Sequence, residues 1–204
     1  SKLVSQIREA GEMGIHVTGL EVNLAEMVEW KGGIVNKLTG GVEQLVTRNG
    51  GTILRGTASF TGVNTLDVTD ESGAVTKVGF EYAVIATGSK PAEIPGFSFD
   101  GEHVLSSTHV MEFKSPPKKL AVVGGGYIGM ELGSVFQRLG TQVTVVEYAD
   151  RILPGFERDL VRPVEKRFTM GGGTVLTGIM AKGWKKSKGG VKIQLKKLSG
   201  GEIP

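Results

Sequence analysis

A glycine-rich turn in the middle of the chain has the spacing that phosphate groups require. Gly124, Gly126 and Gly129 form the pattern G-x-G-x-x-G directly after the apolar segment 120–123. In such a pattern the first glycine permits a tight turn, the second admits a pyrophosphate to the backbone, and the third lets a helix pack closely on the sheet. The helix N-terminus would present unpaired N–H groups to the phosphates. The pattern therefore predicts a phosphate-binding loop.

An acidic residue completes the pattern. Glu147 ends the apolar segment 143–146, about 20 residues beyond the last glycine. A carboxylate at this place accepts hydrogen bonds from ribose hydroxyls and repels a 2′-phosphate, which predicts NAD rather than NADP. The alternative is an α/β turn without a ligand. The residues predicted to bind NAD are Gly124, Gly125, Gly126, Tyr127, Ile128, Gly129 and Glu147.

A second acid, Glu131, lies two positions after Gly129, in the first turns of the predicted helix. One interpretation is ordinary charge complementarity to the helix dipole. The other is that Glu131 faces the nicotinamide end of the cofactor. Spacing alone leaves both interpretations open.

The elements that must position these residues form a βαβ pattern. Apolar residues recur at helical spacing after Gly129, and Gly140 ends that helix. The segments that flank it are short, apolar and rich in β-branched residues, as strands are. The predicted order is strand 120–123, helix 127–139, strand 143–147, helix 157–170 and strand 174–177.

The first part of the chain predicts helices followed by short strands. Residues 1–12 indicate the end of a helix, residues 17–22 an exposed strand or loop, and residues 24–46 a helix that Gly32-Gly33 and Gly40-Gly41 could kink. Turn residues then separate segments typical of a small antiparallel sheet. The strands predicted here are 52–55, 58–60, 65–68 and 75–78, and a buried strand covers 82–86.

Four prolines between residues 90 and 118 indicate a connecting segment. We therefore place a domain boundary at its end. The prediction is a first domain over residues 1–117, which includes the connector, and a second over 118–204.

Composition narrows the classes of function. The 204 residues include 24 Lys and Arg against 21 Asp and Glu, for a formal net charge of +3. So balanced a charge gives no indication of a nucleic-acid partner. No apolar run approaches the roughly 18 residues of a membrane span. We expect neither nucleic-acid binding nor a membrane span.

The chain has no cysteine, which excludes disulfides, thiolate metal sites and cysteine nucleophiles within it. Its histidines, His16, His103 and His109, lack the spacing of a metal site, and we predict none.

Lysines gather near the C-terminus, where polar and apolar residues alternate over 191–196 with the period of a half-buried strand. The cluster is either a polyanion-binding patch or the solvent face of a hairpin, and the alternation favours the hairpin. The cluster comprises Lys182, Lys185, Lys186, Lys188, Lys192, Lys196 and Lys197.

Several motifs together resemble the dihydrolipoamide dehydrogenases, which are class I pyridine nucleotide-disulfide oxidoreductases. The resemblance extends over nearly the whole chain in the family's order and weakens after about residue 170. Ser1-Lys2-Leu3 at one end and Gly200–Pro204 at the other indicate an internal fragment. The matching segments are 38–42, 56–60, 86–89, 122–135, 138–140, 143–147 and 150–154.

The resemblance implies an α/β fold of tandem Rossmann-like FAD- and NAD(P)-binding domains, both incomplete here, with a small antiparallel β insertion. It places Thr87, Gly88 and Ser89 near the flavin. It also places Gly56 and Ala58 against the adenine half of FAD, and Lys2 beside the flavin ring. Met180 falls beside the adenine of NAD.

The implied activity of the full-length protein is oxidation of dihydrolipoamide on a lipoyl domain, with electrons passing through a disulfide and FAD to NAD⁺. The resemblance also implies a homodimer within a 2-oxo acid dehydrogenase complex, in the bacterial cytoplasm or the mitochondrial matrix. The redox cysteines and the catalytic His-Glu pair are expected outside these residues. We therefore expect the chain alone to be inactive.

Two alternatives stay open. The parent could be another flavin disulfide reductase, such as a glutathione or mercuric reductase. Glu147 argues against glutathione reductases, which generally prefer NADPH. The chain could also be a non-catalytic nucleotide-binding fragment.

Overall fold

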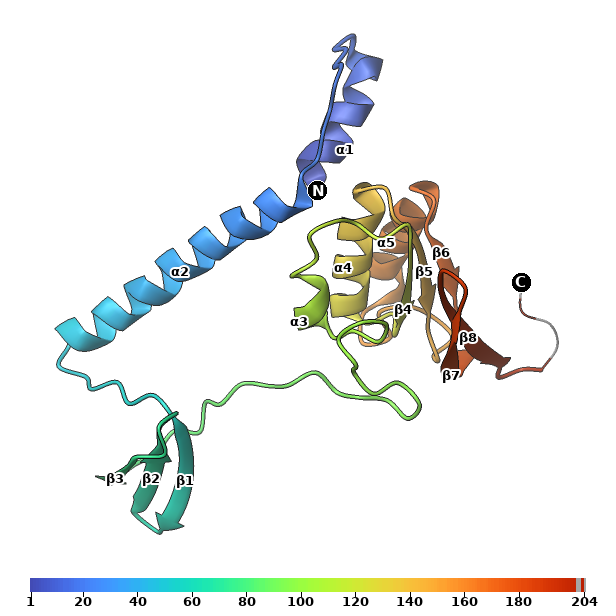
Figure 1. The fold of residues 1–204 in the computed structure, drawn as a ribbon. Helices are drawn as coiled ribbons and strands as arrows, with labels where there is room; N and C mark the ends of the chain where they lie inside the picture. The colour runs from blue at the N-terminus through green and yellow to red at the C-terminus, as the bar shows by residue number, and fades with distance from the viewer. Residues whose placement is uncertain (201–202, 204) are drawn as a thin grey trace. The chain divides into compact units, whose positions relative to one another are not determined.

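The computed structural model describes residues 1–200 and 203 and shows an α/β chain (Figure 1). The chain divides into two compact units. We call residues 29–90 the smaller unit, and residues 1–28 together with 91–204 the larger unit. The predicted boundary at 117/118 stays a prediction.

The larger unit contains the predicted βαβ pattern. Its strands β4 (Lys119–Val123), β5 (Gln142–Val146) and β6 (Thr174–Leu176) form a parallel sheet in the order β4-β5-β6. Helix α4 (Tyr127–Arg138) connects the first pair and α5 (Arg158–Met170) the second. The order is that of one half of a doubly wound sheet, in which the next strand would lie on the free edge of β4.

Helices α4 and α5 lie on the same side of this sheet (Figure 1). The sheet contributes the fully buried Val143 and Val145 to the core that lies between the sheet and these two helices. Phe136 of α4 and Phe168 of α5 are each less than 5% exposed and belong to the same cluster. Burial of each such side chain contributes about 1.5 to 3 kcal/mol to stability, so this core fixes the helix whose N-terminus follows the glycine loop.

The first helices extend the same core. Helix α1 (Lys2–Glu9) precedes a short 3-10 helix (Ala10–Met13), and both Val4 and Leu24 belong to the hydrophobic cluster. Arg8 donates a hydrogen bond of 2.9 Å to the carbonyl oxygen of Arg138, at the end of α4. The N-terminal segment therefore packs against α4 within the larger unit.

Helix α2 (Leu24–Arg48) is continuous, so neither glycine pair interrupts it. The Asn23 side chain accepts hydrogen bonds from the N–H groups of Ala25 and Glu26 and so caps the N-terminus of α2.

The smaller unit holds the predicted antiparallel sheet. Strands β1 (Thr57–Gly62), β2 (Thr65–Thr69) and β3 (Val75–Gly79) pair in sequence order. The predicted strand at 52–55 is wrong, because residues 57–62 occupy the pairing positions beside β2.

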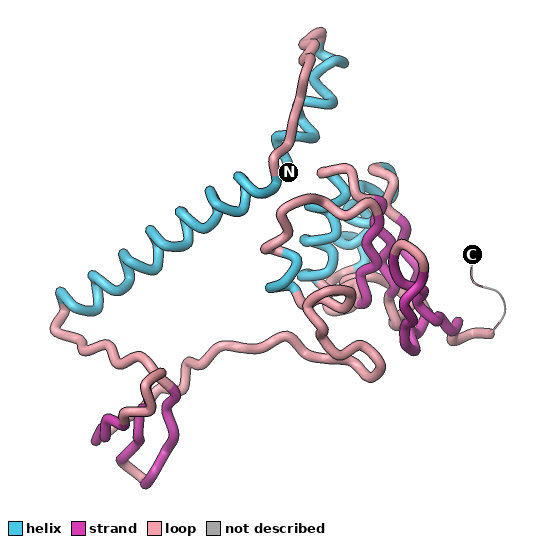
Figure 2. The backbone as a smooth tube through the Cα atoms, viewed as in Figure 1, coloured by secondary structure: helices cyan, strands magenta, loops and turns pink. Residues whose placement is uncertain are grey.

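The predicted buried strand at 82–86 is also wrong. Tyr82 and Val84 are each 90% exposed, and residues 80–93 run as loop (Figure 2). An apolar run becomes a buried strand only beside other strands, and no described strand pairs with this one.

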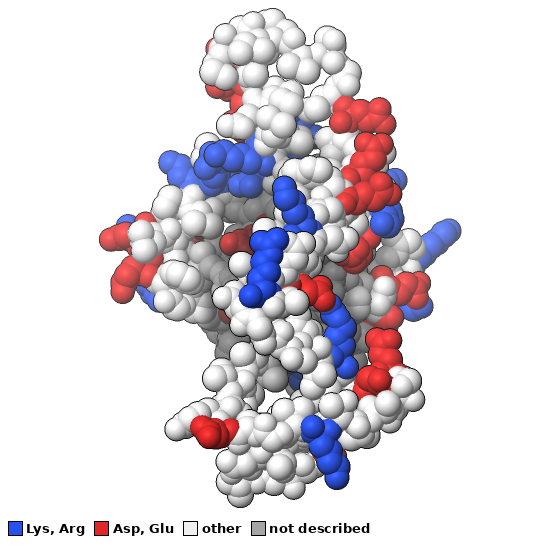
Figure 3. Space-filling model, turned by 90° about the vertical axis from the view of Figure 1, so that its left-hand side faces the viewer, with Lys and Arg blue, Asp and Glu red and all other residues white. Residues whose placement is uncertain are grey.

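The lysine-rich segment forms the predicted hairpin, β7 (Ile179–Ser187) with β8 (Gly190–Lys197). Trp184 and Ile193, which are paired across the hairpin, are both half-buried, whereas the paired Lys185 and Lys192 are exposed. Acidic and basic side chains both occur on the face drawn in Figure 3. Among the described helices, none is long and apolar enough to cross a membrane.

Replacement of Phe168 by alanine tests the core. We expect Phe168→Ala to lower the free energy of unfolding by about 3 to 5 kcal/mol, because it leaves a cavity between α5 and the sheet. The matched control is Val164→Ala on the same helix, where the side chain is 40% exposed, with an expected loss of about 1 kcal/mol or less. Urea unfolding followed by circular dichroism measures both, and equal losses would contradict this core.

Candidate functional site

The glycine loop follows β4 and is hydrogen-bonded to the end of the neighbouring strand β5. The N–H of Gly124 donates to the carbonyl oxygen of Val146 at 2.8 Å, which ties the start of the loop to the neighbouring strand. Gly129 lies so close to the strand that an added Cβ would overlap the Gly124 carbonyl oxygen. Only glycine permits this approach, so the third glycine of the pattern sets how closely α4 packs.

Glu147 follows β5 and is 9% exposed. Its Oε2 accepts a hydrogen bond of 2.6 Å from the N–H of Gly125, and its Oε1 accepts one of 2.7 Å from the N–H of Ala149. These bonds fix the carboxylate beside the loop. Each oxygen keeps a further lone pair for a hydroxyl donor, such as a ribose hydroxyl.

The N-terminus of α4 offers backbone donors beside this carboxylate. Gly126 is the N-cap, and no side chain caps the helix. Among the hydrogen bonds of residues 1–200, none is donated by the N–H of Gly126, Tyr127 or Ile128. A Cβ on Gly126 would meet nothing within 4 Å. The donors therefore face open space that a phosphate could occupy.

The other residues predicted for NAD lie around this loop. Glu131 is exposed on the second turn of α4. Met180 is half-buried in β7, next to Ile179, whose N–H donates to the carbonyl oxygen of Glu147 at 3.0 Å. Met180 thus lies on the carboxylate side of the loop, where an adenosine would lie, and its role stays a prediction.

The residues predicted for FAD are not brought together within one unit. Lys2 is exposed at the start of α1 in the larger unit. In the smaller unit, Gly56 precedes β1 and Ala58 lies within it. Thr87, Gly88 and Ser89 lie in an exposed loop. Their roles at FAD stay predictions.

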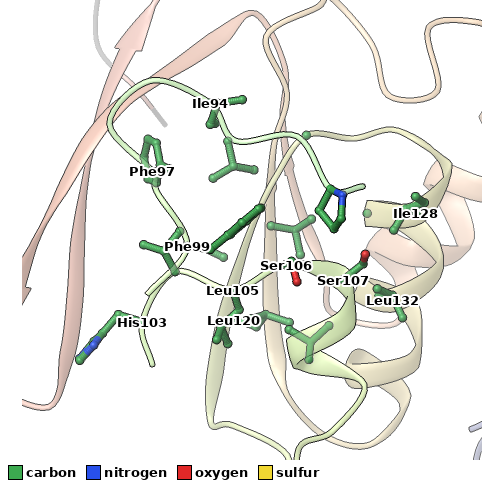
Figure 4. A pocket seen from close by; sticks show the side chains of 18 of the residues that line it. Ile94, Phe97, Phe99, His103, Leu105, Ser106, Ser107, Leu120, Ile128 and Leu132 are labelled. Carbon is green, nitrogen blue, oxygen red and sulfur yellow. The ribbon is translucent and has the colours of Figure 1, made fainter. Parts of the chain in front are cut away.

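A hollow of about 540 Å³ lies along β4 and is lined by the connector, the start of α4 and the hairpin (Figure 4). The motifs in the sequence do not indicate this hollow, and only the aromatic and proline residues of the connector hint at an apolar wall. It adjoins the loop from Gly124 to Gly129 but not Glu147. Its apolar wall suits apolar groups rather than phosphates. The wall includes Ile94, Phe97, Phe99, Leu120, Ile128 and Leu132.

The connector beside this hollow is held by Asp100. Its Oδ1 accepts hydrogen bonds from the N–H groups of Val104, Glu102 and His103, at 2.8, 3.0 and 2.8 Å. These bonds, that of Val104 first, lower the pKa of Asp100 to about 2. Since the folded pKa lies below the ordinary value, this contribution to stability is lost only as the pH falls towards 2.

His103 in the same turn stacks on Trp184 of β7, with ring centroids 5.5 Å apart. The connector and the hairpin are thereby joined at the rim of the hollow. No group of three or more His, Cys, Asp or Glu residues in the described chain could hold a metal ion.

Comparisons with known proteins identify the family. The sequence model of the pyridine nucleotide-disulphide oxidoreductase family matches residues 2–204 of this chain. The chain is 42% identical over 196 residues to dihydrolipoyl dehydrogenase 2 of Haloarcula marismortui, covering 95% of this chain and 41% of the relative. It is 42% identical over 188 residues to dihydrolipoyl dehydrogenase of Staphylococcus aureus, covering 92% and 40%. The chain thus spans about two fifths of the length of these relatives.

Solved structures share the fold. LpdA from Mycobacterium tuberculosis matches with a TM-score of 0.87 at 22% identity, covering 95% of this chain and 43% of that one. The flavoprotein disulfide reductase RclA from Escherichia coli matches with a TM-score of 0.76 at 23% identity, covering 94% and 41%. These matches confirm the predicted fold class. The family model, which matches residues 2–204, shows that the chain belongs to the pyridine nucleotide-disulphide oxidoreductase family.

Proposed function

We propose that this chain forms the NAD-binding part, and a portion of the FAD-binding part, of a dihydrolipoyl dehydrogenase. The relatives at 41 to 42% identity carry that name, and their alignments cover 92 to 99% of this chain. One observation carries the NAD assignment: the Glu147 carboxylate is fixed by the N–H groups of Gly125 and Ala149, beside the unpaired N–H groups that begin α4.

In this proposal each part of the loop has a task. The N–H groups of Gly126, Tyr127 and Ile128 bind the pyrophosphate, supported by the positive end of the α4 dipole. Glu147 accepts hydrogen bonds from the hydroxyl groups of the adenosine ribose. The 2′-phosphate that NADP carries on this ribose would be repelled by the buried carboxylate. This arrangement favours NAD over NADP.

Two of the remaining predicted residues, Glu131 and Lys2, act at the reacting ends of the cofactors. When bound, FAD and NAD supply the two-electron chemistry of the parent enzyme, and the protein supplies position and charge. Glu131 on α4 orients the nicotinamide ribose, and Lys2 stabilises negative charge beside the flavin. Gly56, Ala58 and the loop 87–89 form the FAD contacts that these residues contribute.

The parent's substrate and partners follow from the same assignment. They are dihydrolipoamide on a lipoyl domain, a second copy in a homodimer, and a 2-oxo acid dehydrogenase complex. The redox cysteines lie outside these residues, because the chain contains none. NADH binding to the 204-residue chain therefore tests the site without requiring activity.

The loop glycines give a matched pair of variants. Gly126→Ala adds a methyl group in open space, so we expect the free energy of unfolding to fall by less than about 1 kcal/mol, the cost of alanine at an N-cap. We expect NADH binding to weaken about tenfold or more, because the methyl obstructs the pyrophosphate. Gly129→Ala drives a methyl group into the Gly124 carbonyl oxygen, so we expect the free energy of unfolding to fall by about 1 to 3 kcal/mol. NADH fluorescence titration and urea unfolding measure the two effects. Unchanged NADH affinity in Gly126→Ala would contradict the phosphate assignment.

Glu147 tests the choice of cofactor. We expect Glu147→Gln to weaken NADH binding about tenfold or more, because a charged acceptor of hydrogen bonds is lost. We expect Glu147→Arg to shift the ratio of affinities towards NADPH. The control is Asp150→Asn, which removes a nearby exposed charge whose only described ion pair is with Arg158, at 3.2 Å. Titrations with NADH and NADPH give the ratio, and a ratio unaltered in Glu147→Arg would argue against ribose recognition.

A further inference from the structure

The backbone of Gly125 is held through both of its polar groups. Its N–H donates to Glu147 Oε2 at 2.6 Å, and its carbonyl oxygen accepts a hydrogen bond of 2.8 Å from the N–H of Leu153. The neighbouring N–H of Gly126 has no acceptor in residues 1–200. Gly125 is thus fixed on both sides, directly before the residues whose amides are free.

The Leu153 bond comes from a turn that is itself anchored. Ile152 is fully buried and belongs to the hydrophobic core cluster. A Cβ built on Gly125 would lie 2.8 Å from Ile152 Cγ2, so the turn lies directly against the glycine loop. The chain then closes by a hydrogen bond of 3.0 Å from the N–H of Phe156 to the carbonyl oxygen of Leu153.

Leu153 has an unusual backbone conformation. Its φ is 49°, and in the described part of the chain it is the sole residue other than glycine with a positive φ. The left-handed region is unfavourable for leucine, more so for β-branched residues, and Pro154 restricts Leu153 further. At this positive φ, the N–H of Leu153 is directed at Gly125 and the chain then returns to the start of α5 at Arg158.

We propose that Leu153 is a positioning residue for the dinucleotide. Its left-handed backbone holds the Gly125 carbonyl, and so keeps the N–H groups of Gly126 and Tyr127 directed at the pyrophosphate. Leu153 acts through its main chain and touches no ligand. The inference rests on the proposed binding of NAD to this loop.

Two substitutions separate backbone conformation from side-chain packing. Glycine adopts a positive φ freely but removes the leucine side chain, whereas valine keeps an apolar side chain but resists a positive φ. We expect NADH affinity within about twofold of the original chain for Leu153→Gly, and about tenfold weaker for Leu153→Val. Both are measured by fluorescence titration on the 204-residue chain, well below each variant's melting temperature.

The reverse order of affinities would overturn the proposal in favour of simple packing by the leucine side chain. Equal affinities would also overturn it, because they would show that the backbone conformation of residue 153 has no effect on binding. Failure of the unsubstituted chain to bind NADH would instead overturn the proposed function. The two failures are therefore distinguishable.

Hydrogen exchange on the unsubstituted chain gives a measurement that does not depend on the valine variant's folding. We expect the Gly125 amide to exchange slowly and the Gly126 amide rapidly, since only the first donates within the protein. In Leu153→Gly the slow exchange of Gly125 should persist. Rapid exchange of Gly125 in the unsubstituted chain would show that the loop is not held, and would contradict the proposal.

Discussion

The hydrogen bond between the Glu147 carboxylate and the Gly125 amide is the interaction on which the larger unit's site depends. It joins the end of β5 to the loop that follows β4, at 2.6 Å and in a nearly buried position. A charged acceptor makes such a bond stronger than one between neutral groups. The same carboxylate shapes the loop and, in the proposed function, also accepts hydrogen bonds from a ribose, so the proposed binding and the local structure depend on the same residue.

The βαβ part of the fold could be predicted from sequence because its signals are local. Strand, turn, helix and acid follow one another within residues 119–147, and each position has a steric or charge requirement that glycine, β-branched residues or Glu147 meets. The lysine-rich hairpin could be predicted for the same reason, from the alternation of polar and apolar residues over 191–196, which lie in β8. The NAD-type loop was thus the part of the site most accessible to sequence reasoning.

Other features depend on neighbours that a local pattern does not specify. The apolar residues 82–86 carry the composition of a buried strand, but pairing partners decide whether a strand forms, and none exists among the described residues. Leu153 adopts a positive φ although nothing in its residue type indicates one, because the buried Ile152 and the Gly125 carbonyl constrain it. The hollow beside β4 arises from segments more than 60 residues apart in sequence, Pro91 and Ile193 among them.

Helix α4 begins at Gly126 without a side-chain cap. Most helices satisfy their first amides with a Ser, Thr, Asp or Asn side chain, which stabilises the helix. Under the proposed function, the bound pyrophosphate supplies that stabilisation, so the ligand acts as the missing cap of the helix. By mass action, the first turn of α4 is then most stable when dinucleotide is abundant and frays first when it is scarce. The resistance of this segment to unfolding and proteolysis would thus rise and fall with the supply of cofactor.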